Sequence, residues 1–277
     1  MKLDVIRDPH GTTPPITTAL LLAAGLGSRL SAATSGAPKC LTQVNGTSIL
    51  EQQVSCLERC GFKRLIVVVG HEAEQIKTAL LRYTGNLDVE YVTNAQYRTT
   101  NNVYSLWLAR EAVREPLLLL ESDLYFEPHL LAGMLHPDKI AVARLQPWMQ
   151  GTTVTLDASR HVAAFQLGGT ARYTPSAYKT VNIYALSSST WRQVTIRLES
   201  YISSGRVNDY YEALFKDMVA DGDLDLQAVS FDDGRWYEID TVEDLRAAKA
   251  LFSRHGTSPA PSTSLNRVRD DSAAPHG

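Results

Sequence analysis

The chain has 277 residues, and its 27 basic and 30 acidic side chains give a formal net charge of −3. This length allows one α/β domain with a large buried core. The near balance of charge argues against nucleic acid or a membrane surface as the main partner, and no apolar run approaches the ~20 residues that cross a bilayer. The odd set of cysteines, Cys40, Cys56 and Cys60, favours the reducing cytoplasm over a disulfide-bonded scaffold.

The first half of the chain alternates short apolar runs with amphipathic segments. Before it, the Pro14-Pro15 pair ends an N-terminal arm, residues 1–16, that we expect to be flexible. Alternation of this kind predicts parallel strands joined by right-handed helical crossovers, with ligands bound past the carboxyl ends of the strands. The predicted strands are residues 17–23, 64–69, 89–93 and 117–120, and the predicted helices are residues 48–60, 72–83 and 102–113.

The second half contains shorter strands separated by glycine-rich and polar turns. From residue 253 onward the composition becomes Ser, Pro, Arg and Asp without periodicity, which predicts a disordered tail, residues 253–277. The predicted catalytic domain is therefore residues 17–252. Its remaining strands are predicted at 140–145, 152–156, 161–165, 180–186, 226–231 and 236–239, and its remaining helices at 188–203, 209–220 and 242–252.

The first apolar strand breaks into a Gly25-Leu26-Gly27 turn that is followed by Arg29 and, after Pro38, by Lys39. Glycines let the backbone bend sharply and bring its N–H groups close to a ligand, and the two cations add positive charge at the end of the strand. This combination predicts a triphosphate site. A dinucleotide fingerprint fits poorly because Leu30 stands where a third glycine belongs, and no Gly-Lys-Ser/Thr sequence supports a Walker loop.

Two aspartates each follow a buried strand. Asp123 comes after the leucine run 117–120, and Asp240 comes after Trp236 to Ile239. A carboxylate at such a position is costly without a partner, and Mg²⁺ prefers one or two carboxylates together with substrate phosphates. The sequence favours a magnesium site, with helix capping by Asp240 and turn capping by Asp123 as the alternatives.

The string Asn101-Asn102-Val103-Tyr104-Ser105-Leu106-Trp107 opens a predicted helix, with Asn101 as its N-cap. Asparagine side chains also offer donors and acceptors to a base or a ribose. For Trp107 we expect packing against the core.

The motifs at 22–30, 38–39 and 101–106, together with 237–240, closely resemble those of the nucleotidyltransferases that make activated sugars and alcohols. The asparagine string and the segment 237–240 narrow the resemblance to the cytidylyltransferases that act on phosphocholine or on phosphonates such as 2-aminoethylphosphonate. The resemblance covers residues 17–252. It implies a Rossmann-like, three-layer α/β/α nucleotidyltransferase fold with a mixed, mostly parallel sheet. This chain departs from many members of the superfamily at Glu121-Ser122-Asp123, where those members have Asp-x-Asp.

The resemblance also implies a set of site residues, the substrate CTP and the cofactor Mg²⁺. Arg29 and Lys39 would hold the triphosphate as catalytic cations, and Asp123 and Asp240 would hold the metal. The nucleotide would contact Leu22, Ala23, Ala24, Gly25, Gly27, Ser28, Asn94, Asn101, Asn102 and Ser122, and the acceptor would contact Tyr104, Lys179, Asn182, Asp209, Tyr210 and Glu238.

The acceptor is less clearly specified than the nucleotide. An aminophosphonate needs an acid for its amine, such as Asp209 or Glu212, and a cation for its phosphonate, such as Lys179 or Arg206. Phosphocholine needs an aromatic cage. We expect a phosphonate, with phosphocholine second and a sugar 1-phosphate third. A non-catalytic nucleotide-binding module, an NAD-dependent oxidoreductase and either a monomer or a homodimer stay open. The cage candidates are Trp107, Tyr173, Tyr178, Tyr210, Tyr211 and Trp236.

Overall fold

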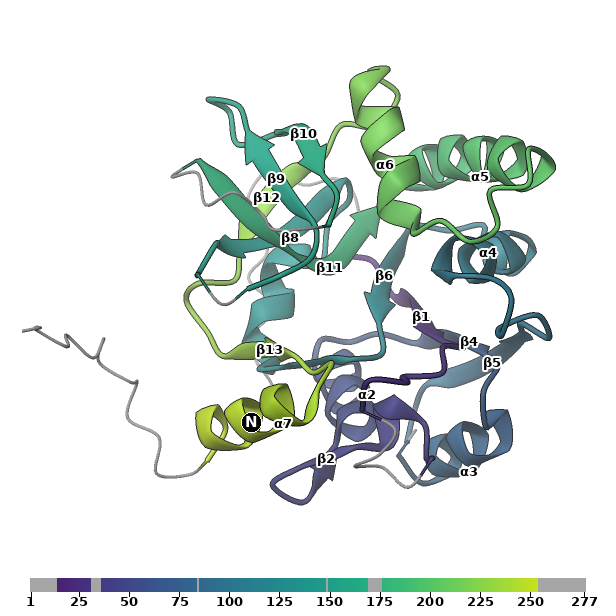
Figure 1. The fold of residues 1–277 in the computed structure, drawn as a ribbon, viewed down its shortest axis with the longest axis vertical. Helices are drawn as coiled ribbons and strands as arrows, with labels where there is room; N and C mark the ends of the chain where they lie inside the picture. The colour runs from purple at the N-terminus through teal and green to yellow at the C-terminus, as the bar shows by residue number, and fades with distance from the viewer. Residues whose placement is uncertain (1–13, 31–35, 84, 148, 169–175, 254–277) are drawn as a thin grey trace, which may run out of the picture.

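The computed structural model describes residues 14–30, 36–83, 85–147, 149–168 and 176–253. Within these residues, nine strands form one mixed sheet (Figure 1). Its main order is β10-β9-β11-β6-β1-β4-β5, and β8 pairs with both β11 and β12 beside that path. Residues 1–13 and 254–277, which make up most of the predicted arm and tail, lie outside the described residues.

The centre of the sheet is parallel. Strand β1 (Thr18–Ala23) pairs in parallel with β4 (Arg64–Val69) and with β6 (Leu117–Glu121), and β4 pairs with β5 (Asp88–Thr93). All six residues of β1 are buried. A strand that is covered on both faces has a continuous apolar sequence rather than an alternating one, which explains why this run is so easily recognised.

The remaining strands extend the sheet beyond β6 and are mostly paired antiparallel to their neighbours. Strand β11 (Ala177–Leu186) pairs antiparallel with β6, β8 (Lys139–Arg144) and β9 (Thr153–Leu156). Strand β10 (Val162–Gln166) pairs antiparallel with β9, and β12 (Gln227–Ser230) pairs in parallel with β8. This switch in direction confirms the expected mixed sheet.

Helices cover both faces of the sheet. Since alternate side chains of β1 point to opposite faces, they pack in two separate core clusters. Leu21 packs in one core cluster with Leu50, whereas Leu20 and Leu22 pack in another with Leu106. The three-layer α/β/α architecture is thereby confirmed. One layer holds α2 (Ile49–Arg59) and α3 (Ala73–Tyr83), and the other holds α4 (Asn102–Leu108), α5 (Ser188–Ser203) and α6 (Tyr211–Ala220).

A small antiparallel sheet joins the end of the domain to its middle. Strand β13 (Trp236–Glu238) pairs with β7 (Leu124–Phe126), and the amide of Ile239 donates to the carbonyl of Asp123 at 3.0 Å. This ladder places the chain segment that contains Asp240 directly beside the segment that contains Asp123. The closing helix α7 (Val242–Leu251) follows at once.

The structure corrects several predicted boundaries. The helix predicted at 102–113 ends at Leu108 and continues only as a 3₁₀ turn, Ala109–Glu111, where the guanidinium of Arg110 donates to the carbonyl of Trp107 at 3.1 Å. The helix predicted at 209–220 begins at Tyr211. Some elements are too short to produce a periodic pattern and were not predicted: β2 (Gln43–Val44), β3 (Thr47–Ser48), β7, the 3₁₀ turn Lys39–Leu41 and the 3₁₀ helix Pro128–Met134. Among the described helices, none has the length and apolar character needed to span a membrane.

Candidate active site

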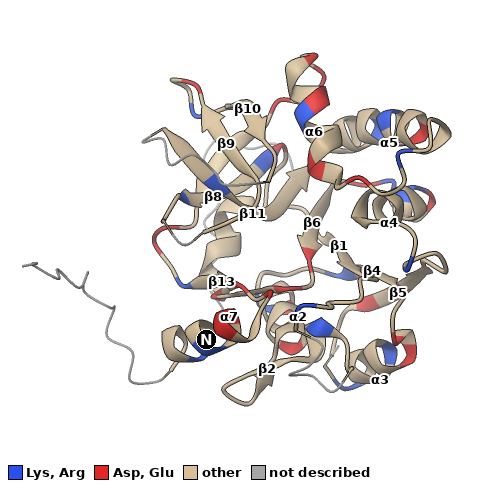
Figure 2. Ribbon diagram, in the orientation of Figure 1, with Lys and Arg blue, Asp and Glu red and all other residues tan. Residues whose placement is uncertain are grey.

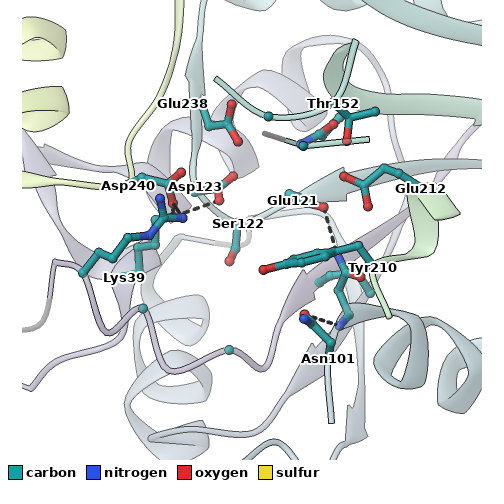
Figure 3. A pocket seen from close by; sticks show the side chains of 18 of the residues that line it. Lys39, Asn101, Glu121, Ser122, Asp123, Thr152, Tyr210, Glu212, Glu238 and Asp240 are labelled. Carbon is teal, nitrogen blue, oxygen red and sulfur yellow. Dashed lines mark hydrogen bonds and ion pairs between the residues drawn. The ribbon is translucent and has the colours of Figure 1, made fainter. Parts of the chain in front are cut away.

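A cleft of about 1040 Å³ opens past the carboxyl ends of the parallel strands. Its walls come from the loop after β1, the start of α4, the end of β6, strand β11, the start of α6 and strand β13 (Figure 3). Parallel α/β sheets bind ligands at this edge, because the loops that follow the strands converge there.

The glycine loop is shaped by two different requirements. Gly27 has φ +58°, and a Cβ at this position would lie 2.8 Å from the Cβ of Lys39, so a side chain would be strained and would clash. A Cβ on Gly25 would meet no protein atom within 4 Å, although Gly25 lines the cleft. The absence of a side chain at Gly25 therefore leaves space on the ligand side of the loop.

Four charged side chains meet beside this loop, and we call them the loop end of the cleft: Arg29, Lys39, Asp123 and Asp240. The ammonium of Lys39 lies 2.9 Å from Asp123 Oδ2 and 2.5 Å from Asp240 Oδ1. The guanidinium of Arg29 lies 3.0 Å from the same oxygen of Asp240 and is largely exposed. The structure thus brings together all four residues predicted to hold the triphosphate and the metal.

Electrostatics at the loop end favour full ionisation of the two groups in its centre. Burial by itself would lower the pKa of Lys39, but Asp123 and Asp240 outweigh it and raise that pKa above its ordinary value. Burial likewise opposes ionisation of Asp240, yet Lys39 and then Arg29 hold the pKa of Asp240 below its ordinary value. Each charge at this end has an opposite partner.

Local structure fixes Asp240 at the junction of β13 and α7. Thr241 is the N-cap of α7, and its side chain exchanges hydrogen bonds with Asp244 in a capping box. Asp240 is therefore not the capping residue, and its carboxylate is directed at Lys39 and Arg29 instead. Asp123 likewise pairs with Lys39 rather than capping a turn.

A second charged group lies deeper in the cleft, and we call it the acid end: Glu121, Lys179, Glu212 and Glu238. Lys179 is 2% exposed, and its ammonium contacts Glu238 at 2.9 Å and donates to the carbonyl of Thr180 at 2.7 Å. Glu212 is 6% exposed, and its Oε2 is buried without a hydrogen-bond partner in the described part of the chain. The end of β6 and the segment between β13 and α7 are both acidic (Figure 2).

The acid end disfavours ionisation, in contrast to the loop end. Burial raises the pKa of Glu212 to about 7, with the negative charge of Glu238 adding to that shift. Burial, followed by repulsion from Asp123 and Glu212, raises the pKa of Glu121 well above its ordinary value. The positive charge near these carboxyls does not offset their burial and mutual repulsion.

Two asparagines shape this part of the cleft. Asn102 donates from Nδ2 to Glu121 Oε1 at 3.2 Å and accepts at Oδ1 from the amide of Tyr211 at 2.9 Å, so its side chain ties α4 to β6 and α6. Asn182 has φ +58°, a left-handed conformation that asparagine tolerates better than most residues, at a break in the register of β11. Asn101 caps α4 as expected, accepting from the amide of Asn102 at 2.8 Å.

Of the predicted site residues, only Ala23 and Tyr104 do not line the cleft. Ala23 packs in the core cluster beside Leu21, and the Tyr104 ring lies 5.2 Å from that of Trp107. Trp107 packs against the core as expected, with its indole N–H donating to Glu199 at 2.8 Å. The predicted residues that do line the cleft are Leu22, Ala24, Gly25, Gly27, Ser28, Arg29, Lys39, Asn94, Asn101, Asn102, Ser122, Asp123, Lys179, Asn182, Asp209, Tyr210, Glu238 and Asp240.

Two residues of the acid end, Glu121 and Glu212, were not predicted as site residues. Glu121 had no assigned role, and Glu212 was only one of two acids considered for an amine. Its position was a usable signal, because Glu212 directly follows Tyr211 on a helix whose apolar residues Leu214, Phe215 and Met218 are buried. An acid beside such a face is unusual without a partner. Of the aromatic cage candidates, Tyr210 and Trp236 line the cleft, and Tyr173 lies outside the described residues.

The loop end has the donor chemistry of a magnesium site. The carboxylates of Asp123 and Asp240 are close enough to share one ammonium, and Asp123 Oδ1 is buried with no hydrogen-bond partner in the described structure. The described residues contain no group of three or more His, Cys, Asp or Glu arranged to hold a metal. Mg²⁺ in proteins is typically bound by one or two carboxylates and takes its other ligands from water and substrate.

The fold, the glycine loop and the paired charges define an α/β nucleotide-binding protein of the nucleotidyltransferase class. Residues 19–170 match the model of the MobA-like NTP transferase domain, and the chain belongs to this family. The resemblance inferred from the sequence motifs is confirmed.

Several curated relatives cover most of this chain. It is 34% identical over 243 residues to the CMP-5′-(3-aminopropyl)phosphonate synthase of Streptomyces rubellomurinus, a match that includes 85% of this chain and 38% of the relative, so the chain spans well under half of that protein. It is 27% identical to the choline-phosphate cytidylyltransferase of Streptococcus pneumoniae, over 84% of this chain and 97% of the relative. It is 26% identical to the 2-aminoethylphosphonate cytidylyltransferase of Lancefieldella rimae, over 86% and 94%.

A solved structure supports the fold assignment. The CTP:phosphocholine cytidylyltransferase of Streptococcus pneumoniae superimposes with a TM-score of 0.74 at 23% identity, and the match includes 86% of this chain and all of that structure. At this level of identity, the similarity confirms the three-layer fold.

Proposed function

We propose that this protein is a magnesium-dependent cytidylyltransferase that transfers CMP from CTP to a small aminoalkylphosphonate and releases pyrophosphate. The observation on which the proposal depends most is the convergence of Arg29, Lys39, Asp123 and Asp240 beside the glycine loop. Relatives named for aminopropylphosphonate and 2-aminoethylphosphonate support the nucleotide and the acceptor class.

In this proposal the loop end holds the triphosphate. The open space at Gly25 lets phosphate oxygens approach the backbone, and Arg29 and Lys39 offset their charge. Arg29 is the more exposed of the two cations and has freedom to move onto an incoming nucleotide. Asp123 and Asp240 would hold Mg²⁺, which when bound neutralises phosphate charge.

The reaction needs no nucleophile from the protein. An oxygen of the acceptor phosphonate attacks the α-phosphorus of CTP, a new P–O bond forms, and the bond from the α-phosphorus to the bridging oxygen breaks as pyrophosphate leaves. The residues of the loop end align the reacting groups and stabilise the charge that develops, which is how phosphoryl-transfer sites accelerate such reactions. The acceptor then lies on the acid-end side of the α-phosphate.

Phosphocholine is the second candidate acceptor, and two observations favour it. The choline-phosphate enzyme of Streptococcus pneumoniae is aligned over nearly its whole length. In addition, the aromatic side chains of Tyr210 and Trp236 line the cleft, and aromatic faces attract quaternary ammonium groups. A sugar 1-phosphate ranks third.

The test is a pyrophosphate-release assay with CTP, ATP, GTP and UTP against 2-aminoethylphosphonate, 3-aminopropylphosphonate, phosphocholine and glucose 1-phosphate, with Mg²⁺ or with EDTA. We expect turnover with CTP and an aminophosphonate, and its loss in EDTA. Absence of pyrophosphate with CTP and every acceptor would refute the proposal. Binding of CTP without turnover would indicate a non-catalytic module, and quenching of tryptophan fluorescence by NAD would favour the oxidoreductase.

A further inference from the structure

The acid end of the cleft has more carboxylates than cations. Its one cation, Lys179, is already engaged by Glu238 and by the carbonyl of Thr180. Arg206 also lines the cleft, but its guanidinium pairs with Asp209 at 2.7 Å and with Asp217 at 3.3 Å. Glu121 and Glu212 are therefore left without an ion-pair partner among the described side chains.

Glu212 stands out within this group, because it is buried and one of its two carboxylate oxygens has no hydrogen-bond partner in the described structure. Glu212 is 6% exposed, its Oε2 has no hydrogen-bond partner in the described structure, and its side chain points into the cleft (Figure 3). An unpaired buried carboxylate destabilises a protein, so its presence in a ligand cleft indicates that a cationic ligand supplies the missing partner.

The surroundings of Glu212 distinguish between two kinds of cation. A primary ammonium has three N–H donors, whereas a trimethylammonium has none and prefers the faces of aromatic rings. Two aromatic rings of the adjoining core, Tyr184 and Tyr211, are fully buried and stack edge to face at 5.7 Å, with Phe215 packed against both, whereas Tyr210 and Trp236 line the cleft. The faces of Tyr184 and Tyr211 are therefore covered by protein, while the unpartnered Oε2 of Glu212 is free to accept a hydrogen bond from an ammonium.

We propose that Glu212 binds the primary ammonium of the acceptor and selects aminoalkylphosphonates over acceptors that have a trimethylammonium or no amine. The inference depends on the proposed function, since it concerns the acceptor half of that site. Glu212 is the first acid on α6, and the amide of Tyr211 beside it is anchored by Asn102 of α4, so the fold holds this carboxylate at a fixed depth in the cleft.

The experiment combines one substitution with one change in the substrate. Kinetic constants are measured for the full chain and for Glu212→Gln with 2-aminoethylphosphonate and with n-propylphosphonate, in which a methyl group replaces the ammonium. We expect E212Q to raise KM for the aminophosphonate about 10- to 100-fold, because a hydrogen bond between charged groups is lost. The KM for propylphosphonate and for CTP should stay unchanged.

The matched control is Glu243→Gln, the same chemical change at a side chain that is 77% exposed on α7, and it should alter none of these constants. If E212Q does not fold, Glu212→Asp keeps the charge but shortens its reach, and the same selective rise in KM is expected. An equal effect of E212Q on both phosphonates, or a wild-type protein that uses propylphosphonate or phosphocholine as well as the amine, would overturn the inference.

Calorimetric titration of 2-aminoethylphosphonate separates this inference from the proposed function. Binding in the presence of CTP that is weakened by E212Q, without pyrophosphate release, would keep the ammonium site and refute the enzymatic proposal. Turnover of CTP with an amine-free acceptor, as efficient as with the amine, would support the enzymatic proposal and refute the ammonium site. If no acceptor binds or reacts, both are refuted.

Discussion

The two ends of the cleft use the same residue types in opposite ways. At the loop end, Asp123 and Asp240 share Lys39, and Arg29 adds a second cation, so every charge is paired. At the acid end, Lys179 forms its ion pair with Glu238, and Glu121 and Glu212 have no ion-pair partner among the described side chains. The pKa of Asp240 is lowered accordingly, whereas the pKa of Glu212 is raised to about 7.

This difference shows that a buried carboxylate has no fixed chemical meaning until its partners are known. Paired carboxylates stay ionised and can exchange one cation for another, as a metal site requires. An unpaired buried carboxylate reduces the free energy of unfolding until a ligand supplies its partner. The charges of the loop end are therefore paired within the protein, whereas we propose that those of the acid end are paired by a ligand.

The largest effect is expected from a substitution at the loop end. Asp123→Asn removes the charge that faces Lys39 and one of the two predicted metal ligands, so turnover should fall on the order of 100- to 1000-fold. Steady-state pyrophosphate release measures it, with Glu243→Gln as the control. Near-normal activity in D123N would contradict the metal assignment, and circular dichroism would show whether the variant is folded.

The next prediction concerns the pH dependence of stability at the acid end. The folded-state pKa of Glu212 is about 7, above the ordinary value of 4.5, so the folded state binds the proton more tightly than the unfolded state. Its contribution to stability is complete below pH 4.5 and is lost as pH rises through 7. The free energy of unfolding of E212Q relative to wild type should therefore rise between pH 5 and pH 8, by on the order of 2 kcal/mol.

Urea denaturation of both proteins at the two pH values measures this difference. A constant gap between E212Q and wild type across the range would show that Glu212 is ionised throughout. The outcome directly tests whether the two ends differ in charge balance.

The third prediction compares the two glycines of the loop. Gly27→Ala forces a side chain into a left-handed conformation and against Lys39, so it should reduce the free energy of unfolding by about 1–2 kcal/mol. Gly25→Ala places its methyl group in open space and should leave stability unchanged while raising KM for CTP about 10-fold, through lost phosphate contacts. Thermal melts and CTP kinetics distinguish the two, and equal effects on CTP would contradict the assigned difference.

The smallest effect is expected at the cap that positions Asp240. Thr241→Ala removes the side chain that accepts from the amide of Asp244, which should cost about 1 kcal/mol of stability. Because the β7–β13 ladder still holds Asp240 near Asp123, turnover should fall only a few-fold. A loss as large as that of D123N would show that the cap, and not the ladder, fixes the loop end.

Much of the loop end could be predicted from the sequence, because its parts are local. The apolar run of β1 is buried on both faces, and the glycine turn follows it directly. The helix that Asn101 caps was likewise predictable from neighbouring residues. Ala23 and Tyr104 were assigned to the site from their motifs alone, and their side chains face the core or a neighbouring ring instead.

The sequence by itself determined which strands are buried, where the chain turns at Gly25 and Gly27, and that the domain is of the α/β type, since these depend on residues close together in the chain. The tertiary structure alone decided which charges are paired. Lys39 and Asp240 are 201 positions apart and meet only through the β7–β13 ladder, and Glu212 reaches the cleft only because α6 packs beside α4. A charge acts through its distance to other charges, and sequence separation does not set that distance.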